Sequence, residues 1–170
     1  MPQAKPIIIA HRSLLYGPDK TKENTLEQIV YTLTNTPFDI EIDVWFDNQT
    51  LQFYLGHDEP QIRVPAPQLD FLNNPRFWIH AKNNEALFEL ISQLPPHIHI
   101  FSHDQDDATL TSTRIPWVYP GKPISSTTPR CPAVIVMPER TPDAYTIEQL
   151  KRAHAICTDW PYRYQELTSS

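Results

Sequence analysis

Residues 7–12 read Ile-Ile-Ile-Ala-His-Arg, and residues 40–45 read Ile-Glu-Ile-Asp-Val-Trp. The first stretch is a continuous apolar run, which is typical of a strand buried on both faces in a parallel sheet. The second alternates apolar with acidic residues, so its two carboxylates point to one face and its aliphatic side chains to the other. Together they predict buried strands that carry chemically active side chains at or near their ends.

Apolar residues at helical spacing follow and separate such strands. Residues 26–33 carry them at i, i+3, i+4 and i+7, after a capping box that opens at Thr25. The same spacing recurs in residues 87–94, and a second capping box at Thr146 opens a last predicted helix that carries Ile147, Leu150 and Ala153. The chain has 18 prolines and only 3 glycines, and the prolines cluster between apolar runs, where they stop and stiffen elements. Strands that alternate with helices predict βαβ units and a parallel sheet.

The number of strands points to a barrel. Beyond the two quoted runs, extended segments are predicted at residues 51–55, 77–81, 97–101, 117–119, 133–137 and 155–157. About seven of these strands suit a TIM (β/α) barrel, with 51–55 as a hairpin partner. A full barrel needs roughly 200 residues, whereas this chain has 170. We therefore expect one α/β domain over residues 1–170, a compact and incomplete TIM barrel that lacks helices in the region 102–132.

Some shorter segments are harder to assign. Asp106-Asp107 is expected to begin a helical turn, and residues 162–167 a terminal one. His154 lies near the end of the last predicted helix, where a structural role is expected. Cys131 and Cys157 have no metal-type spacing and lie beside apolar runs, so both are expected to be small buried side chains.

Composition excludes several classes of protein. The formal net charge is −6 and there is no basic stripe, so we expect no nucleic-acid partner. No apolar run approaches the roughly 18 residues that span a bilayer. The first run, residues 7–10, is too short for the core of a signal peptide. We therefore expect a soluble, unexported, cytoplasmic protein without a membrane span.

The acidic strand predicts a metal site. Glu41 and Asp43 are two residues apart, so their carboxylates face the same way. Two such carboxylates repel each other unless a cation lies between them. A hard divalent cation, Mg²⁺ or Ca²⁺, satisfies this requirement because it prefers oxygen ligands.

Other strand ends carry histidines and cations. His11-Arg12 follows the first strand, Gly56-His57-Asp58 follows residues 51–55, and His80-Ala81-Lys82 closes residues 77–81. In an α/β barrel the carboxyl ends of the strands converge on one site. There a metal and a lysine would offset phosphate charge, while one histidine acts as general base and another as general acid.

The segments that carry these residues resemble a known family. "IIIAHR" at 7–12, "ENT" at 23–25, "IEIDVWFD" at 40–47, "FYLGHD" at 53–58 and "ICTDWP" at 156–161 are similar to signature segments of the glycerophosphodiester phosphodiesterases. Those enzymes belong to the phospholipase-C-like phosphodiesterase barrels. The resemblance implies the same barrel type and a metal-dependent phosphoric diester hydrolase, a glycerophosphodiesterase of lipid metabolism, whose substrate is a small phosphodiester.

The resemblance also implies residue roles. His11 and His57 match the catalytic acid/base pair. Glu41 and Asp43 match metal ligands, and Arg12 matches a residue that contacts the phosphate.

The chain departs from the family at two positions. Ser13 stands where the family usually has glycine after His-Arg. Lys82 matches a phosphate-supporting lysine of a Glu-x-Lys strand, but His80 takes the place of that strand's carboxylate. We expect His80 to be the third metal ligand, with Glu23, Glu139 or water as alternatives.

Two further functions compete with hydrolysis. The chain could be a barrel that binds phosphate or a phosphodiester but has lost turnover, a reading motivated by His80 and the small size. A metal-dependent hydrolase of the amidohydrolase kind ranks lower, because its His-x-His belongs on the first strand, whereas His97-Ile98-His99 comes late.

Overall fold

The computed structural model describes residues 4–124 and 131–169. Its strands are β1 (Ile7–Ala10), β2 (Asp39–Asp47), β3 (Gln52–Leu55), β4 (Ile62–Arg63), β5 (Phe77–Ala81), β6 (His99–Phe101), β7 (Ala108–Leu110), β8 (Pro116–Val118), β9 (Cys131–Val136) and β10 (Ala153–Thr158). The helices of this part are α1 (Leu26–Asn35), α2 (Gln68–Leu72), α3 (Asn84–Gln93), α4 (Ile147–Arg152) and α5 (Pro161–Ser169), with short 3₁₀ turns η1 (His11–Ser13) and η2 (Pro138–Arg140).

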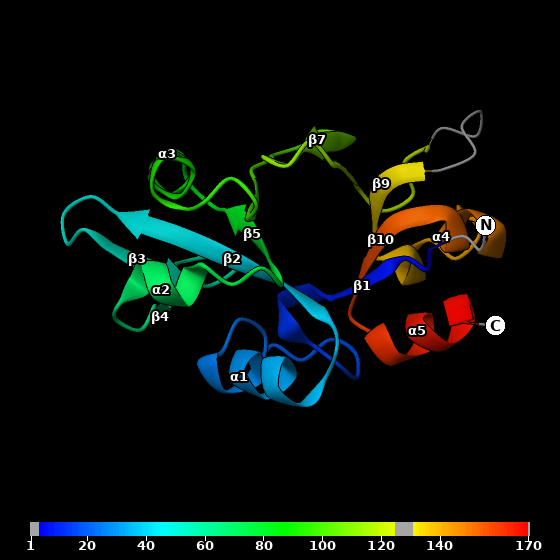
Figure 1. Ribbon diagram of the computed structural model, residues 1–170, viewed down its shortest axis with the longest axis horizontal. Coiled ribbons are helices and arrows are strands. Elements are labelled where there is room, and N and C mark those ends of the chain that lie inside the picture. Colours follow the sequence, from blue (N-terminus) through cyan, green and yellow to red (C-terminus); the bar gives the residue numbers. More distant parts are fainter. Residues whose placement is uncertain (1–3, 125–130, 170) are drawn as a thin grey trace.

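The sheet is mixed and strongly curled (Figure 1). Parallel pairing runs through β6-β5-β2-β1-β10-β9-β8, which confirms the predicted parallel sheet and mixed α/β class. The predicted hairpin is also present, because β3 pairs antiparallel with the second half of β2 and β4 extends it. Within residues 4–124 and 131–169 no strand pairing joins β6 to β8, so the sheet is an open, curled part of a barrel.

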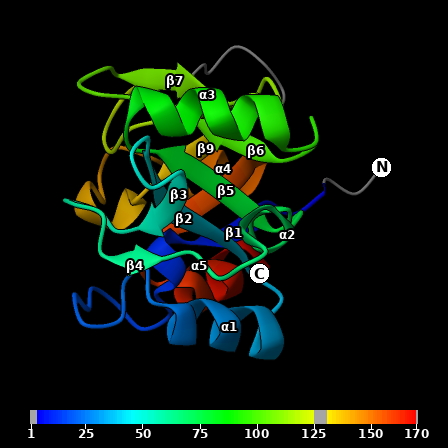
Figure 2. The ribbon, with the colours of Figure 1, turned by 90° about the vertical axis from the view of Figure 1, so that its left-hand side faces the viewer.

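Helices cover the outside of the curl, and large side chains fill the inside. Figure 2 shows the sheet between α3 and α1. Apolar residues of β2 and β5 pack with α1 and α3, whereas those of β1, β9 and β10 pack with α4 and α5. The interior is occupied by a separate cluster that includes Ile9, Trp78, Phe101 and Trp117. The alternation along each strand therefore separates an outer core from a packed interior.

Several local predictions were incomplete or wrong. The predicted turn at Asp106-Asp107 leads instead into β7, because the Asp107 carbonyl accepts a hydrogen bond from the Tyr119 amide in strand pairing with β8. The predicted terminal turn is a nine-residue helix, α5. Neither α2 nor β4 was predicted. Residues 102–124 contain no helix, which agrees with the expected position of the missing helices.

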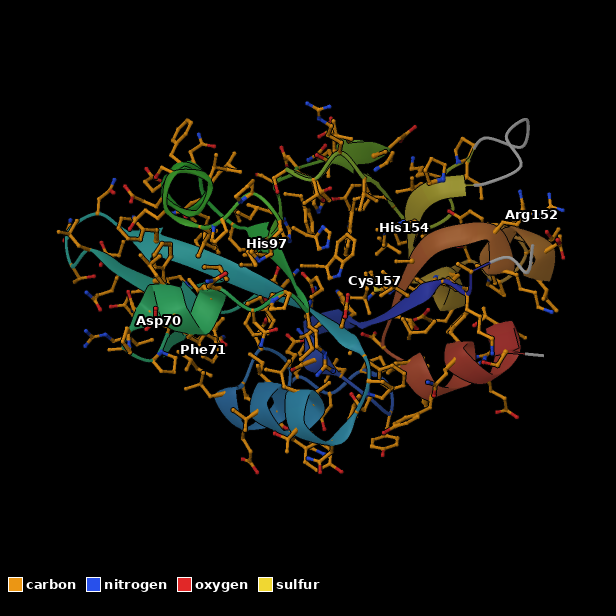
Figure 3. All side chains as sticks on the ribbon, viewed as in Figure 1. Asp70, Phe71, His97, Arg152, His154 and Cys157 are labelled. Carbon is orange, nitrogen blue, oxygen red and sulfur yellow. The ribbon has the colours of Figure 1, made fainter. Side chains whose placement is uncertain are left out.

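His154 lies in β10 and not at the end of a helix, because the backbone is already extended at Ala153. The register between β10 and β9 shifts there, and the His154 ring lies edge-on, 6.2 Å from that of Trp78. His99 is paired with Trp78 on the neighbouring strand β6, and its ring stacks on that of Trp78 at 3.6 Å. His97 lies in the turn before β6, apart from His154 in β10 (Figure 3). No His-x-His metal group is found among the described side chains.

Cys157 is fully buried and free, as predicted, and burial raises the pKa of its thiol. The side chain of Cys131 lies outside the described residues. In the part of the chain that the structure describes, no helix combines the length and apolar character needed to cross a bilayer.

Arg76 connects the end of α1 to the start of β2. Its guanidinium donates hydrogen bonds to the backbone carbonyls of Leu33 (2.8 Å), Thr36 (2.8 Å) and Phe38 (3.0 Å). Helix ends leave carbonyls without intrahelical partners, and Arg76 supplies donors for the carbonyls at the C-terminal end of α1. The side chain therefore fixes how α1 leads into the strand that carries the acidic pair.

Replacing Arg76 with methionine should lower the free energy of unfolding by about 2 kcal/mol, because several carbonyls lose a charged donor at once. Urea denaturation followed by circular dichroism measures the change. Arg63→Met is the matched control: Arg63 is exposed, and within the described residues its side chain bonds only Gln52, so its effect should stay within about 0.5 kcal/mol. Equal effects of the two substitutions would contradict this role.

Candidate functional site

Glu41 and Asp43 lie on one face of β2, as predicted, and both are buried, at 3% and 1% exposure. Burial, and then the neighbouring Asp43 charge, raises the pKa of Glu41. The Glu41 carboxylate accepts a hydrogen bond from the Arg12 backbone amide at 3.0 Å. The acidic pair is thus removed from water and depends on nearby donors and cations.

Asp43 is surrounded by such groups. Its Oδ1 faces His80 Nδ1 at 2.9 Å and Lys82 Nζ at 3.6 Å. Its Oδ2 accepts from Asn24 Nδ2 at 2.9 Å and faces Arg12 Nε at 3.4 Å. Burial alone would raise the pKa of Asp43, but the His80 hydrogen bond and charge, with the Lys82 and Arg12 charges, hold it well below its usual range. Asp43 is therefore ionised wherever the protein is folded at ordinary pH.

The segment after β1 brings its donors to this acidic pair through unusual backbone conformations. Arg12, Ser13 and Asn24 all have left-handed φ angles of 50°, 61° and 56°. The backbone amide of Asn24 donates to the Arg12 carbonyl at 3.1 Å, and Asn24 Oδ1 accepts from the backbone amide of Asp43 at 3.0 Å. The left-handed conformation at Ser13 also gives a physical reason for a glycine preference there. Asn24 was not predicted as a site residue, although it is the centre of the Glu-Asn-Thr segment.

His11 is held from behind by Asp159. The two side chains are buried, and His11 Nδ1 lies 2.7 Å from Asp159 Oδ1. Glu139 Oε1 in turn accepts from the Asp159 amide and the Thr158 hydroxyl, both at 2.9 Å. His11 Nε2 then faces Glu41 Oε2 at 3.9 Å. The carboxylate at Nδ1 fixes the orientation of the ring and leaves Nε2 toward the acidic pair.

His57 reaches the same place from the segment after β3. It lines a cavity of about 240 Å³ together with His11, Arg12, Glu41 and Asp43. Its Nδ1 lies 2.6 Å from Asp58 Oδ1, and its side chain is 34% exposed. Burial, and then the Arg12 charge, lowers the pKa of His57. Both predicted catalytic histidines therefore meet the acidic pair at one cavity.

The other predicted residues are placed less uniformly. His80 lines the cavity, whereas Lys82 does not, although its ammonium contacts Asp43. Glu23 pairs with Arg12 Nη1 at 3.0 Å, and Glu139 supports Asp159 as described. Neither alternative carboxylate joins the acidic pair in a metal-type group.

The far wall of the cavity is largely aromatic and was not predicted as a unit. His80 stacks on Phe101 at 5.0 Å and on His103 at 4.7 Å, and His103 packs on Tyr119 at 3.9 Å. Trp117 stacks on Phe101 at 4.2 Å. Burial, and then the His80 charge, lowers the pKa of His103 to about 4. Phe101 and Trp117 lie on β6 and β8, and His103 and Tyr119 follow these strands, whose adjacency to the site is a long-range property of the fold.

One group of described side chains has the composition of a metal site: Glu41, Asp43 and His80, whose ligand atoms all lie within 4.8 Å of one another. The residues fit a divalent cation in two respects. They supply two carboxylates and an imidazole, all buried, and the raised pKa of Glu41 indicates that its charge is undercompensated. The set includes His80, the residue expected as third ligand, and so contains a nitrogen donor beside the two carboxylates from which Mg²⁺ or Ca²⁺ was expected.

Comparison with known proteins gives no sequence match and one structural similarity of low identity. No family profile matches the sequence, and no curated protein matches it. Its fold can be superposed on a crystal structure of a glycerophosphoryl diester phosphodiesterase from Parabacteroides distasonis ATCC 8503, covering 99% of this chain and 88% of that chain. The identity is 15% and the TM-score is 0.46. A similarity at this level assigns neither a family nor an activity.

The contact between His11 and Asp159 predicts a pH effect. Burial acts to lower the pKa of His11, but the hydrogen bond that its ring donates to Asp159 and the Glu41 charge outweigh it, so the pKa is raised. A raised pKa means that protonated His11 stabilises the fold below about pH 6.5, and that this contribution is lost as pH rises through the folded-state pKa.

Asp159→Asn should therefore lower the pKa of His11 and reduce the gain in stability on the acidic side of pH 6.5. NMR titration of the imidazole signals in EDTA-treated protein measures the pKa directly. Asp58→Asn is the matched control, since it removes a carboxylate from His57 and should leave the His11 titration in place. A His11 pKa that stays unchanged in Asp159→Asn would refute the proposed support.

Proposed function

We propose that the protein is a metal-dependent phosphodiester hydrolase, similar in chemistry to glycerophosphodiester phosphodiesterases, and that His11 and His57 act as its general acid/base pair. One observation carries the proposal: two histidines, Arg12 and a buried pair of carboxylates line a single cavity. Each of these groups answers a need of phosphodiester hydrolysis, namely proton transfer, binding of an anion and binding of a divalent cation.

Glu41, Asp43 and His80 would hold the cation. When bound, a divalent cation supplies Lewis-acid stabilisation of negative charge on phosphate oxygens. Arg12 lines the cavity and would bind the phosphate, although Glu23 and Asp43 share its charge. Lys82 would act indirectly: its ammonium group offsets the charge of the metal ligand Asp43.

The two histidines would move the protons. One imidazole nitrogen accepts the proton of the nucleophile, which is water or a neighbouring hydroxyl of the substrate, as its oxygen bonds to phosphorus. The other histidine donates a proton to the alcohol oxygen as its bond to phosphorus breaks. Asp159 orients His11 and Asp58 orients His57 through Nδ1, so that Nε2 is the nitrogen left for each transfer.

The cavity favours a compact substrate. Its volume of about 240 Å³ holds on the order of eight waters at roughly 30 Å³ each. That space suits the phosphate and one of the two alcohols of a small diester. The aromatic wall of Phe101, His103, Trp117 and Tyr119 would face the organic part of the diester.

The purified protein, supplied with divalent cation, should hydrolyse at least one member of a panel of small phosphodiesters that includes glycerophosphodiesters. EDTA should abolish the activity, and His11→Ala and His57→Ala should each lower kcat by about 10²- to 10⁴-fold. Release of the free alcohol measures turnover. His97→Ala, at an exposed position that does not line the cavity, is the matched control and should keep full activity. A panel left intact with Mg²⁺, Ca²⁺ and Mn²⁺ would refute the proposal.

A phosphate-binding barrel without turnover is the second candidate, because Asp43 already contacts Arg12, His80 and Lys82. The two candidates differ in what the histidine substitutions change. If the parent protein binds a phosphodiester without cleaving it, and His11→Ala and His57→Ala keep that affinity, the binding function is the correct one.

A further inference from the structure

We propose that His80 makes the Glu41–Asp43–His80 site selective for a divalent first-row transition metal, such as Mn²⁺ or Zn²⁺, over Mg²⁺ and Ca²⁺. The inference rests on the metal site of the proposed function and specifies its ion. It replaces the expectation of Mg²⁺ or Ca²⁺, which followed from the two carboxylates alone.

The position of His80 is dictated by the sheet. β2 and β5 are parallel, and their register sets Asp43 directly beside His80. Side chains at paired positions point to the same face of a sheet, here the interior face that also carries Glu41. The three ligand atoms therefore lie within 4.8 Å of one another because of strand pairing, and the group is a property of the fold.

Two neighbouring rings, those of Phe101 and His103, also hold the His80 ring in place. It stacks nearly parallel to Phe101, at an interplanar angle of 9°, and to His103, at 15°. His80 Nδ1 lies 2.9 Å from Asp43 Oδ1. A preoriented ligand loses little conformational freedom when it binds, so an imidazole in this position favours a metal that accepts nitrogen.

The donor set determines which metal benefits. Mg²⁺ and Ca²⁺ are hard cations that prefer oxygen ligands and gain little from imidazole. Imidazole suits zinc, iron, copper and nickel, while carboxylates also suit manganese, so a mixed set of two carboxylates and one imidazole favours divalent transition metals.

The local charge balance acts in the same direction. Lys82 Nζ lies 3.6 Å from Asp43 Oδ1, and Arg12 Nε lies 3.4 Å from Asp43 Oδ2. These cations offset much of the carboxylate charge on which Mg²⁺ and Ca²⁺ depend. The same cations repel every divalent metal ion equally, so the bond to the imidazole nitrogen, from which Mg²⁺ and Ca²⁺ gain little, becomes the larger part of what distinguishes the metals.

Metal binding to the EDTA-treated full-length protein tests the inference without reference to turnover. Isothermal titration calorimetry with MnCl₂, ZnCl₂, MgCl₂ and CaCl₂ gives the ratio of affinities. Pulsed electron paramagnetic resonance of the Mn²⁺-loaded protein detects the ¹⁴N nucleus of a directly bound imidazole. We expect Mn²⁺ and Zn²⁺ to bind more tightly than Mg²⁺ and Ca²⁺, and a ¹⁴N signal to be present.

The decisive variant is His80→Glu, which exchanges the nitrogen donor for a third carboxylate. The ratio of Mn²⁺ to Mg²⁺ affinity should fall by on the order of tenfold to a hundredfold, and the ¹⁴N signal should disappear. His97→Gln is the matched control, since His97 is an exposed histidine that neither lines the cavity nor belongs to the ligand group; it should keep both properties. If His80→Glu does not fold, His80→Gln makes the same comparison with a neutral oxygen donor.

An unchanged affinity ratio, or a ¹⁴N signal that survives in His80→Glu, would overturn the inference and leave His80 as a hydrogen-bond donor to Asp43. A ¹⁴N signal lost instead in His11→Gln would place the bound imidazole at His11 and overturn it as well. The proposed function can fail independently of this inference. In that case the protein would still bind transition metals selectively but would cleave no phosphodiester.

Discussion

Two carboxylates buried side by side on β2 are the constraint around which this molecule is organised. At 3% and 1% exposure, Glu41 and Asp43 have lost most of their hydration, which is costly for ionised groups unless donors and cations replace the water. The replacement comes from two directions: the segment between β1 and α1 contributes Arg12 and Asn24, and β5 with the residue after it contributes His80 and Lys82. The polar interior end of the barrel thus forms as one network, and removal of any member would leave a buried charge with fewer partners.

The cost of this network appears in the backbone. Arg12, Ser13 and Asn24 adopt left-handed conformations, which non-glycine residues rarely adopt. The Ser13 hydroxyl is buried without a hydrogen-bond partner in the described part of the chain. Such local strain persists only where surrounding contacts impose it, and it concentrates at functional sites. Here the contacts are the Arg12 amide on Glu41 and the Asn24 side chain on Asp43, so the same interactions that compensate the acidic pair also hold the strained turn.

Sequence periodicity predicted the features that depend on local pattern. The alternation in residues 40–45 gave the correct face for both carboxylates, and strand-end positions were enough to bring His11 and His57 to one cavity. The missed support of His11 depends on distant parts of the chain. Asp159 lies 148 residues from His11, and its carboxylate could be assigned to that ring only by the pairing of β1 with β10. The hairpin of β7 and β8 was missed for a different reason: its strands have three residues each and pair across a short turn, and the preceding Asp106-Asp107 was interpreted as the start of a helical turn.

The positions of the site residues in the strand order explain how so small a barrel can support the site. Most of the candidate residues lie on or directly after β5, β2, β1 and β10, which are consecutive in the sheet. Each of these four strands packs against or leads into a helix of the described chain, so the outer face behind the site is covered by α1, α3, α4 and α5. The helix-free stretch, residues 102–124, lies between β6 and β9 on the far wall of the cavity. That wall contributes aromatic surface and no carboxylate, so the loss of its helices shortens the chain without removing support from the buried charges.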